Sequence, residues 1–266
     1  MNKRKIMALA LTLSMVAILA IGGTLAYFTD TDKEVNTFTV GGVKIDLIEQ
    51  QGNEDGTDLV DYVQEDKLLM PIVGSAQGEK YPNGQPKAAN YVDKVVTVEN
   101  EGKSAAYVRA YFAIPSALDD GNDTFNAGLN VLHFNYGNNN GVSTFGNEWN
   151  WKNESGTWKY YETEIDGVKY NVYYADYTKV LAAGATTEQF ISGVYLDSHV
   201  DMVDGKYVDT RDPQADISIL AGTVKCPVMA VAVQAAGFDN ADAAVEAAFG
   251  ANFDPFEGTN VTNWQK

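Results

Sequence analysis

The sequence predicts an all-β protein, an antiparallel β-sandwich with long loops and one or two short helices. Through most of the chain, apolar and polar residues alternate with a period of two, which is typical of half-buried strands. Turns rich in Gly, Asp and Asn separate these runs, and one segment, residues 238–249, has the apolar spacing of a helix. Half-buried strands must cover their apolar faces, and two sheets packed face to face do so.

Residues 1–26 have the composition of a cleaved export signal. A short basic region, residues 2–5, precedes an apolar run of about 16 residues that is interrupted only by Thr12 and Ser14. Small residues then lead to Ala26, where a signal peptidase would cut and leave Tyr27 as the new N-terminus. The apolar run is shorter than the roughly 20 residues that span a bilayer, and an uncleaved anchor is the alternative.

Four alternating segments are expected in the first half of the remaining chain. Residues 37–40 and 43–47 are strand-like, and residues 50–90 are mostly loop because they are rich in Gly, Asp, Glu, Asn and Pro. Residues 93–98 and 105–114 are two further strands. The short Gly-containing turn between these two strands predicts that they pair as a hairpin.

The second half contains the clearest hairpin signal, Asp166-Gly167 between the alternating runs 157–165 and 168–174. Asp-Gly supplies the positive φ angles of a type I′ turn, whose twist matches the flanking strands. A strand is expected at 187–196, before an acidic, polar stretch that contains a second Asp-Gly turn. Residues 224–233 form the most apolar strand, expected to be central from Val228 onward, with Pro227 at its start or at a bulge.

The last expected element is the helix at 238–249. Asp239 or Asn240 is suited to cap its start and Gly250 its end. A helix of this kind is expected to pack on one end of the sandwich rather than to enter a membrane, and a second short helix near 116–129 is an alternative to loop. No internal repeat or linker composition divides the chain, so residues 27–266 are expected to form a single domain.

The charge balance excludes one class of partner. The 266 residues include 36 Asp and Glu against 19 Lys and Arg, which gives a formal net charge of −17 at pH 7. Nucleic-acid binding depends on Lys and Arg contacts with phosphates, so no nucleic-acid partner is expected. Loss of residues 1–26 removes three basic and no acidic residues, which leaves 240 residues with a charge of −20. The single Cys226 excludes an internal disulfide and is expected to be buried in its apolar run.

The sequence carries no catalytic or cofactor motif. The two histidines, His133 and His199, lack the spacing of a zinc site, and neither a Gly-x-Ser-x-Gly elbow nor a phosphate-binding glycine loop occurs. We therefore expect no enzymatic activity, no catalytic residue, no metal ligand and no cofactor. A Ca²⁺ site remains the alternative, because Ca²⁺ prefers oxygen ligands and acidic residues cluster at 54–55, at 119–123 and at 197–212.

Aromatic residues gather in the middle of the chain and allow two interpretations. Trp149, Trp151, Trp158, Tyr160 and Tyr161 would either make a sugar-stacking surface or pack between strands, and the second is the more common use of aromatics in sheets.

The N-terminal region resembles a known family. Residues 22–30 read Gly-Gly-Thr-Leu-Ala-Tyr-Phe-Thr-Asp, residues 36–41 read Asn-Thr-Phe-Thr-Val-Gly, and residues 43–47 read Val-Lys-Ile-Asp-Leu. This succession is similar to the start of the TasA/camelysin family, exported proteins of Gram-positive bacteria that a SipW-type signal peptidase processes. Two further stretches, within residues 96–109 and 181–196, are also similar.

The resemblance implies a jelly-roll-like sandwich that is secreted and builds fibres in the extracellular matrix or at the cell surface. In such fibres, residues 27–40 act as a donor strand that completes an open sheet edge of the next subunit. Phe28, Phe38 and Val40 would enter that neighbour's groove, and head-to-tail addition of this kind yields a filament. The implied partners are further copies, other matrix proteins and the signal peptidase during export, with membrane contact only through the uncleaved signal.

Two other functions remain open. The protein would serve as an adhesin-like module that binds carbohydrate or protein at the cell surface, or as a metal-dependent peptidase, a class to which some members of the family have been assigned. No zinc-ligand motif supports the peptidase.

Overall fold

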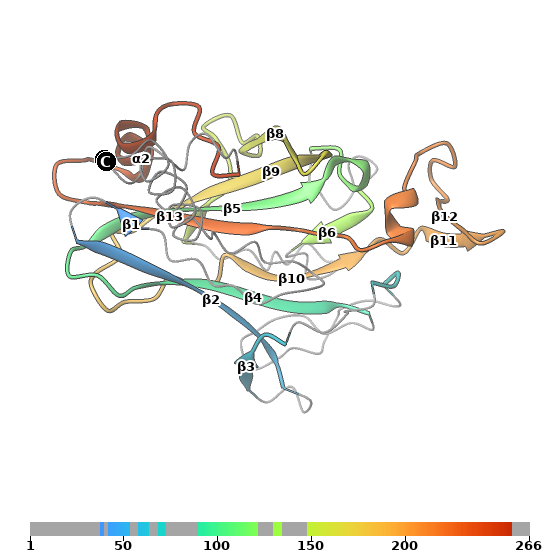
Figure 1. Cartoon of the computed structure of the whole chain (residues 1–266), viewed down its shortest axis with the longest axis horizontal. Coiled ribbons are helices and arrows are strands. Elements are labelled where there is room, and N and C mark those ends of the chain that lie inside the picture. Colours follow the sequence, from blue (N-terminus) through green and yellow to red (C-terminus); the bar gives the residue numbers. More distant parts are fainter. Residues whose placement is uncertain are drawn as a thin grey trace, which may run out of the picture.

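The computed structural model describes residues 38–39, 42–53, 58–63, 69–72, 90–121, 130–134 and 148–256. These residues form two antiparallel sheets that pack face to face, and one α-helix covers part of the outer face of the second sheet (Figure 1). The predicted all-β antiparallel sandwich is therefore confirmed. The proposed signal peptide, residues 1–26, lies outside the described residues, as do Tyr27, Phe28 and Val40.

The first sheet has six strands in the order β1-β2-β4-β10-β6, with β3 paired to the end of β2. The strands are β1 (Phe38–Thr39), β2 (Val43–Gly52), β3 (Leu59–Asp61), β4 (Val92–Asn100), β6 (Leu132–Phe134) and β10 (Ile191–Leu196). The alternation in β2 is as predicted, since Val43, Ile45 and Leu47 are buried. The prediction that residues 50–90 are mostly loop missed the β2–β3 pairing, which joins polar residues at the sheet edge and leaves little apolar pattern.

The second sheet has five strands in the order β13-β5-β9-β7, with β8 also paired to β9. The strands are β5 (Ala106–Pro115), β7 (Trp149–Asn150), β8 (Tyr160–Ile165), β9 (Val168–Tyr177) and β13 (Val228–Gln234). Asp166 and Gly167 have φ angles of 53° and 81°, so the predicted type I′ hairpin between β8 and β9 is confirmed. Pro227 immediately precedes β13, as expected for a residue that cannot donate to the ladder.

A second hairpin lies in the acidic stretch 197–216. Among the described strands, β11 (Val200–Val203) and β12 (Lys206–Asp209) pair only with each other, and they extend from one end of the sandwich (Figure 1). Asp204 and Gly205 form its turn with φ angles of 51° and 75°. The Asp-Gly turn was recognised in the sequence, but the strands on either side were not, because their exposed side chains lack a buried face.

The predicted hairpin between residues 93–98 and 105–114 is wrong. Strand β4 belongs to the first sheet and β5 to the second, so the connection crosses between the layers. Its backbone pairs instead with the start of β2, where Gly102 N donates to Lys44 O at 3.0 Å. A Cβ atom at Gly102 would lie 2.6 Å from Lys44 N, so only glycine allows this close approach.

The predicted central position of residues 224–233 is also wrong. Strand β13 is the terminal strand of the second sheet and pairs only with β5 among the described strands. It is nevertheless buried from Val228 to Val233, because one face meets the core and the other meets the helix. A strand that is covered on both faces is apolar throughout, and this pattern does not show whether it is central or terminal.

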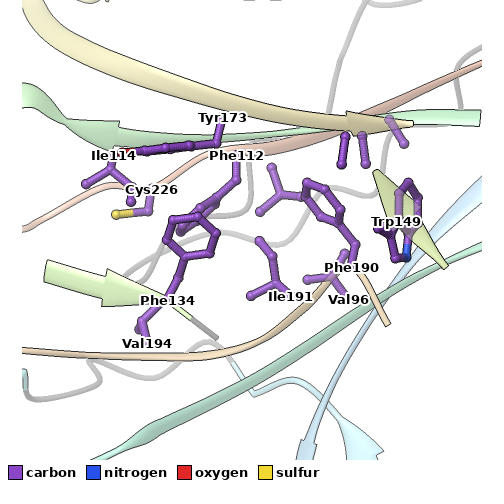
Figure 2. Packing of buried hydrophobic residues seen from close by; sticks show 14 of the residues in the cluster. Val96, Phe112, Ile114, Phe134, Trp149, Tyr173, Phe190, Ile191, Val194 and Cys226 are labelled. Carbon is purple, nitrogen blue, oxygen red and sulfur yellow. The ribbon is translucent and has the colours of Figure 1, made fainter. Parts of the chain in front are cut away.

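The main core lies between the two sheets. Figure 2 shows Phe112 and Tyr173 of the second sheet facing Phe134 and Val194 of the first. Cys226 is fully buried in this core, as predicted, and burial raises the pKa of its thiol well above the usual value.

A smaller apolar cluster lies on the outer face of the second sheet. It joins Tyr111, Val172 and Val231 to the helix α2 (Ala241–Phe249) and to Phe253. The helix is capped as predicted, because Asn240 Oδ1 accepts from Ala243 N at 2.9 Å and Gly250 ends it with φ 96°. In place of the second helix near 116–129, the described part forms the 3₁₀ turn η1 (Ser116–Leu118), and a further 3₁₀ turn, η2 (Ser218–Ala221), precedes β13.

Candidate functional site

The best candidate for a binding site is an open groove of about 790 Å³ on the outer side of the second sheet. Strands β5 and β9 form its floor with Tyr107, Tyr174 and Asp176. One wall is the segment 152–160 that leads from β7 into β8, and the other is the start of α2 at residues 239–242. The groove therefore joins three parts of the chain that are distant in sequence.

A network of charged side chains fixes the floor of the groove. Arg109 Nε and Nη2 donate to the two carboxylate oxygens of Asp176, at 2.6 and 3.2 Å, and Nη2 also donates to Asp242 Oδ1 at 2.5 Å. Lys159 Nζ donates to Asp176 Oδ2 at 2.8 Å. Burial by itself would lower the pKa of Arg109, but the hydrogen bonds and charge of Asp176 outweigh burial and raise it. The guanidinium thus stays charged and joins the floor to the α2 wall, while Lys159 joins the 152–160 wall to the same Asp176.

Aromatic rings line the same groove. The guanidinium of Arg109 lies 5.0 Å from the ring centroid of Tyr174, and Lys152 Nζ lies 5.0 Å from that of Trp158. Tyr107 is fixed by its hydroxyl, which donates to Phe238 O at 3.3 Å. Burial raises the pKa of Tyr174 above its usual value, so its hydroxyl remains a neutral hydrogen-bonding group.

The wall at 152–159 is held by its own turn. Asn153 Oδ1 accepts hydrogen bonds from the backbone N of Ser155 and of Thr157, each at 3.0 Å. Lys152 and Trp158 form an isolated antiparallel bridge across the base of this turn. The wall is therefore organised before any ligand binds.

The lining combines aromatic, polar and charged groups. Its described side chains are Tyr, Trp, Asn, Lys, Asp, Glu, Thr, Val and Ala. Flat rings beside fixed donors and acceptors are typical of a site that holds a ligand and sets its orientation.

The five aromatic residues of the predicted sugar-stacking surface are divided by the structure. Trp149, Trp151 and Trp158 are all buried in the main core, where the strand-packing interpretation is correct. Tyr161 packs against the outer cluster and donates to Asp254 Oδ1 at 2.8 Å, so only Trp158 and Tyr160 line the groove. Indole rings between the sheets contribute to stability and do not contact a ligand.

Sequence reasoning missed Tyr107, Arg109 and Tyr174. The alternation of β5 places Tyr107 and Arg109 on the face opposite Ala106 and Val108, and this signal was available. Their partners on β9 and α2 were not predictable from local pattern, because Arg109 lies 67 residues from Asp176 and 133 from Asp242.

The two histidines meet at a different place, one carboxylate beside the β11–β12 hairpin. His133 Nε2 lies 3.0 Å from Asp197 Oδ2, and His199 Nδ1 lies 2.7 Å from Asp197 Oδ1. Arg211 links Asp197 to the buried Asp209. Within the described ranges, no group of three or more His, Cys, Asp or Glu side chains is arranged to hold a metal ion. The cluster therefore ties the hairpin to β6 and β10.

This cluster makes stability depend on pH in the acid range. Burial would raise the pKa of Asp197, but hydrogen bonds from His133 and His199 outweigh it and hold the pKa below its ordinary value of 3.8. The ionised Asp197 carboxylate stabilises the fold above its unfolded-state pKa, and that contribution is lost as the pH falls through the folded-state pKa.

We expect Asp197→Asn to lower the free energy of unfolding by about 1–3 kcal/mol at pH 6, and by less with each step from pH 4 to pH 2. Urea unfolding at each pH measures it, with the exposed Glu164→Gln as control; a cost that does not change with pH would contradict the assignment.

The proposed donor-strand residues are only partly described. Phe38 belongs to β1 and pairs antiparallel with Lys44 of its own chain, next to the pair Thr39–Val43. At its other end, β2 pairs with β3 from Gln50 to Gly52. Between these pairings, no described strand pairs with residues 45–48 on the outer edge of β2.

No family model, curated protein or solved structure matches the chain. Among the residues that the structure describes, no helix combines the length and the apolar composition needed to cross a membrane.

Proposed function

We propose that the chain is a secreted structural protein of the cell surface or biofilm matrix, and that its subunits assemble by adding a strand to the outer edge of β2. The observation that carries the proposal is that no described strand pairs with this edge at residues 45–48, between β1 and β3. Unpaired strand edges accept a further strand through backbone hydrogen bonds. The TasA/camelysin resemblance of the N-terminal region supports the same mode of assembly.

The backbone groups of this edge point outward at two residues. Glu49 O accepts from Tyr62 N at 3.0 Å on the outer side of β2. Because successive residues of a strand point their backbone groups to opposite sides, Ile45 and Leu47 present their N–H and C=O groups to the same outer side. Their side chains are buried in the core, which keeps this part of the edge in register.

The register of β1 identifies a suitable donor. Phe38 lies opposite Lys44 and Thr39 opposite Val43, so a strand that continued toward the N-terminus would set residues 34–37 opposite residues 45–48. Val35 would then lie opposite Leu47. We propose that in the fibre residues 34–39 take this register on β2 of a neighbouring copy instead of on their own β2, which makes the addition head-to-tail and the product a filament.

The experiment compares the full secreted chain with a variant that lacks residues 27–37. The variant keeps β1 and every described contact, so we expect a folded monomer that does not form fibres in negative-stain electron microscopy. A matched variant keeps the segment but carries Val35→Pro, which removes the backbone N–H that would face Leu47 without shortening the chain. Fibres from the deletion variant would overturn the proposal, whereas loss of fibres in both variants would support it.

The charge of the subunits should control assembly. Copies that each carry −20 after signal removal repel one another, and the Debye length falls from about 30 Å at 0.01 M salt to about 8 Å at 0.15 M. We therefore expect little assembly at neutral pH in 0.01 M salt and rapid assembly at or above 0.15 M. Light scattering across a NaCl series measures this, and MgCl₂ at equal ionic strength tests for a specific effect of divalent cations. Equal assembly at all salt concentrations would show that repulsion does not limit it.

A further inference from the structure

We infer that the groove between residues 152–160 and the start of α2 is a binding site for a neutral carbohydrate chain. It belongs to the second sheet and shares no described residue with the outer edge of β2 in the first. A subunit in a filament would therefore keep the groove available. The inference does not rest on the proposed assembly, and each would survive failure of the other.

A sugar ring has an apolar C–H face and polar hydroxyl groups, and the lining offers a complementary surface for each. The rings of Tyr107, Tyr160 and Tyr174, which are not buried, provide apolar surface for the C–H side of a pyranose. Around them, Asn150, Lys152 and Asp242 provide amide, ammonium and carboxylate groups suited to hydroxyls. A volume of about 790 Å³ falls in the range of roughly 300–1,000 Å³ usual for small-ligand sites, and the open side would let a longer chain pass through.

Binding capacity remains after the internal contacts are made. One oxygen of Asp242 accepts from Arg109, while its side chain is 75% exposed, so the carboxylate can also accept from a sugar hydroxyl. Lys152 is exposed and its ammonium lies over the Trp158 ring. Because Arg109, Asp176 and Asn153 hold their surroundings in place, little side-chain freedom would be lost on binding.

The charges favour a neutral ligand over an acidic one. Arg109 and Lys159 are already paired with Asp176, and the lining carries four carboxylates, Glu154, Asp176, Asp239 and Asp242, against two ammonium groups, Lys152 and Lys159. The groove is therefore net negative, which disfavours phosphates and uronates. The net charge of −17 would further repel a polyanion.

The test is isothermal titration calorimetry on the full chain, in monomeric form at low salt. The probes are hexasaccharides of glucose, mannose and N-acetylglucosamine, with hexagalacturonate as the charged counterpart. We expect at least one neutral hexasaccharide to bind and hexagalacturonate not to bind. Lys152→Ala and Asp242→Asn should each weaken binding about tenfold, because each removes a charged hydrogen-bonding group.

Matched controls separate local from general effects. Asp201→Asn changes an exposed carboxylate on the β11–β12 hairpin and should leave binding unchanged, as should deletion of residues 27–37. All variants are at exposed positions or outside the described fold, and an unchanged melting temperature confirms that they remain folded. The inference is overturned if no neutral hexasaccharide binds at about 10 mM, if only hexagalacturonate binds, or if both groove variants bind as tightly as the parent chain.

Discussion

Replacing Lys94 with alanine should lower the free energy of unfolding by about 3–5 kcal/mol, because the change leaves a buried carboxylate without its counter-charge. Lys94 lies on β4 between Val92 and Val96, on the face that points into the sandwich, and its side chain is 0% exposed. Its Nζ lies 3.0 Å from Glu49 Oε2 of β2 and 4.1 Å from the ring centroid of Tyr62. Burial lowers the pKa of Lys94, and the charge of Glu49 partly offsets this effect.

A double variant separates the net contribution of the Lys94–Glu49 ion pair to stability from the cost of leaving one of its charges unpaired. Lys94→Met with Glu49→Leu removes both charges and keeps similar volume, and it should be close to neutral or even stabilising. Urea unfolding followed by tryptophan fluorescence measures all three proteins. A cost below about 1 kcal/mol for Lys94→Ala would show that Glu49 finds water or another partner, and it would contradict the placement of the pair inside the core.

Replacing Trp151 with alanine should cost about 3–5 kcal/mol, the range for removal of a large aromatic side chain from a packed core. Its ring stacks on Phe190 with centroids 4.5 Å apart and an interplanar angle of 13°. It also contacts Phe134 at 5.6 Å and Trp158 at 6.2 Å. The side chain joins the two sheets, since Trp151 follows β7 in the second sheet while Phe134 belongs to β6 in the first.

The control for this variant is a truncation of comparable chemistry at the surface. Met202 on the β11–β12 hairpin is 55% exposed, so Met202→Ala should change stability by no more than about 0.5 kcal/mol. Unfolding of both variants in urea gives the two values. If Trp151→Ala changed the free energy of unfolding only slightly, the ring would have to lie at the surface, as in the sugar-stacking interpretation of residues 149–161, and its placement in the core would be contradicted.

The parts of the fold that local pattern predicts are those in which one face is buried and a turn is chemically specific. The alternation at Val43, Ile45 and Leu47 predicts β2, and Asp166-Gly167 predicts the β8–β9 hairpin. The helix was predictable together with both ends, because Asn240 and Gly250 meet the requirements of its caps.

The parts that were not predictable depend on pairing between distant segments. The turn at 100–102 is suited to a hairpin, yet hydrogen bonds to β2 direct the chain into the other sheet. The apolar run of β13 results from cover by the core and by α2, and it carries no information about strand order. The groove depends on Arg109 reaching both Asp176 and Asp242, and no local signal joins those residues.

The most direct test of strand addition is amide hydrogen exchange at Ile45 and Leu47, compared between the monomer and the assembled fibre. Both residues present their N–H groups to the outer side of β2, where no described strand pairs with them, whereas Asp46 and Ile48 pair toward β4 and serve as internal references. We expect exchange at Ile45 and Leu47 to slow by about tenfold or more on assembly, with little change at the references. Unchanged exchange at Ile45 and Leu47 in well-formed fibres would contradict the account, because the edge of β2 would then not be the surface where copies join.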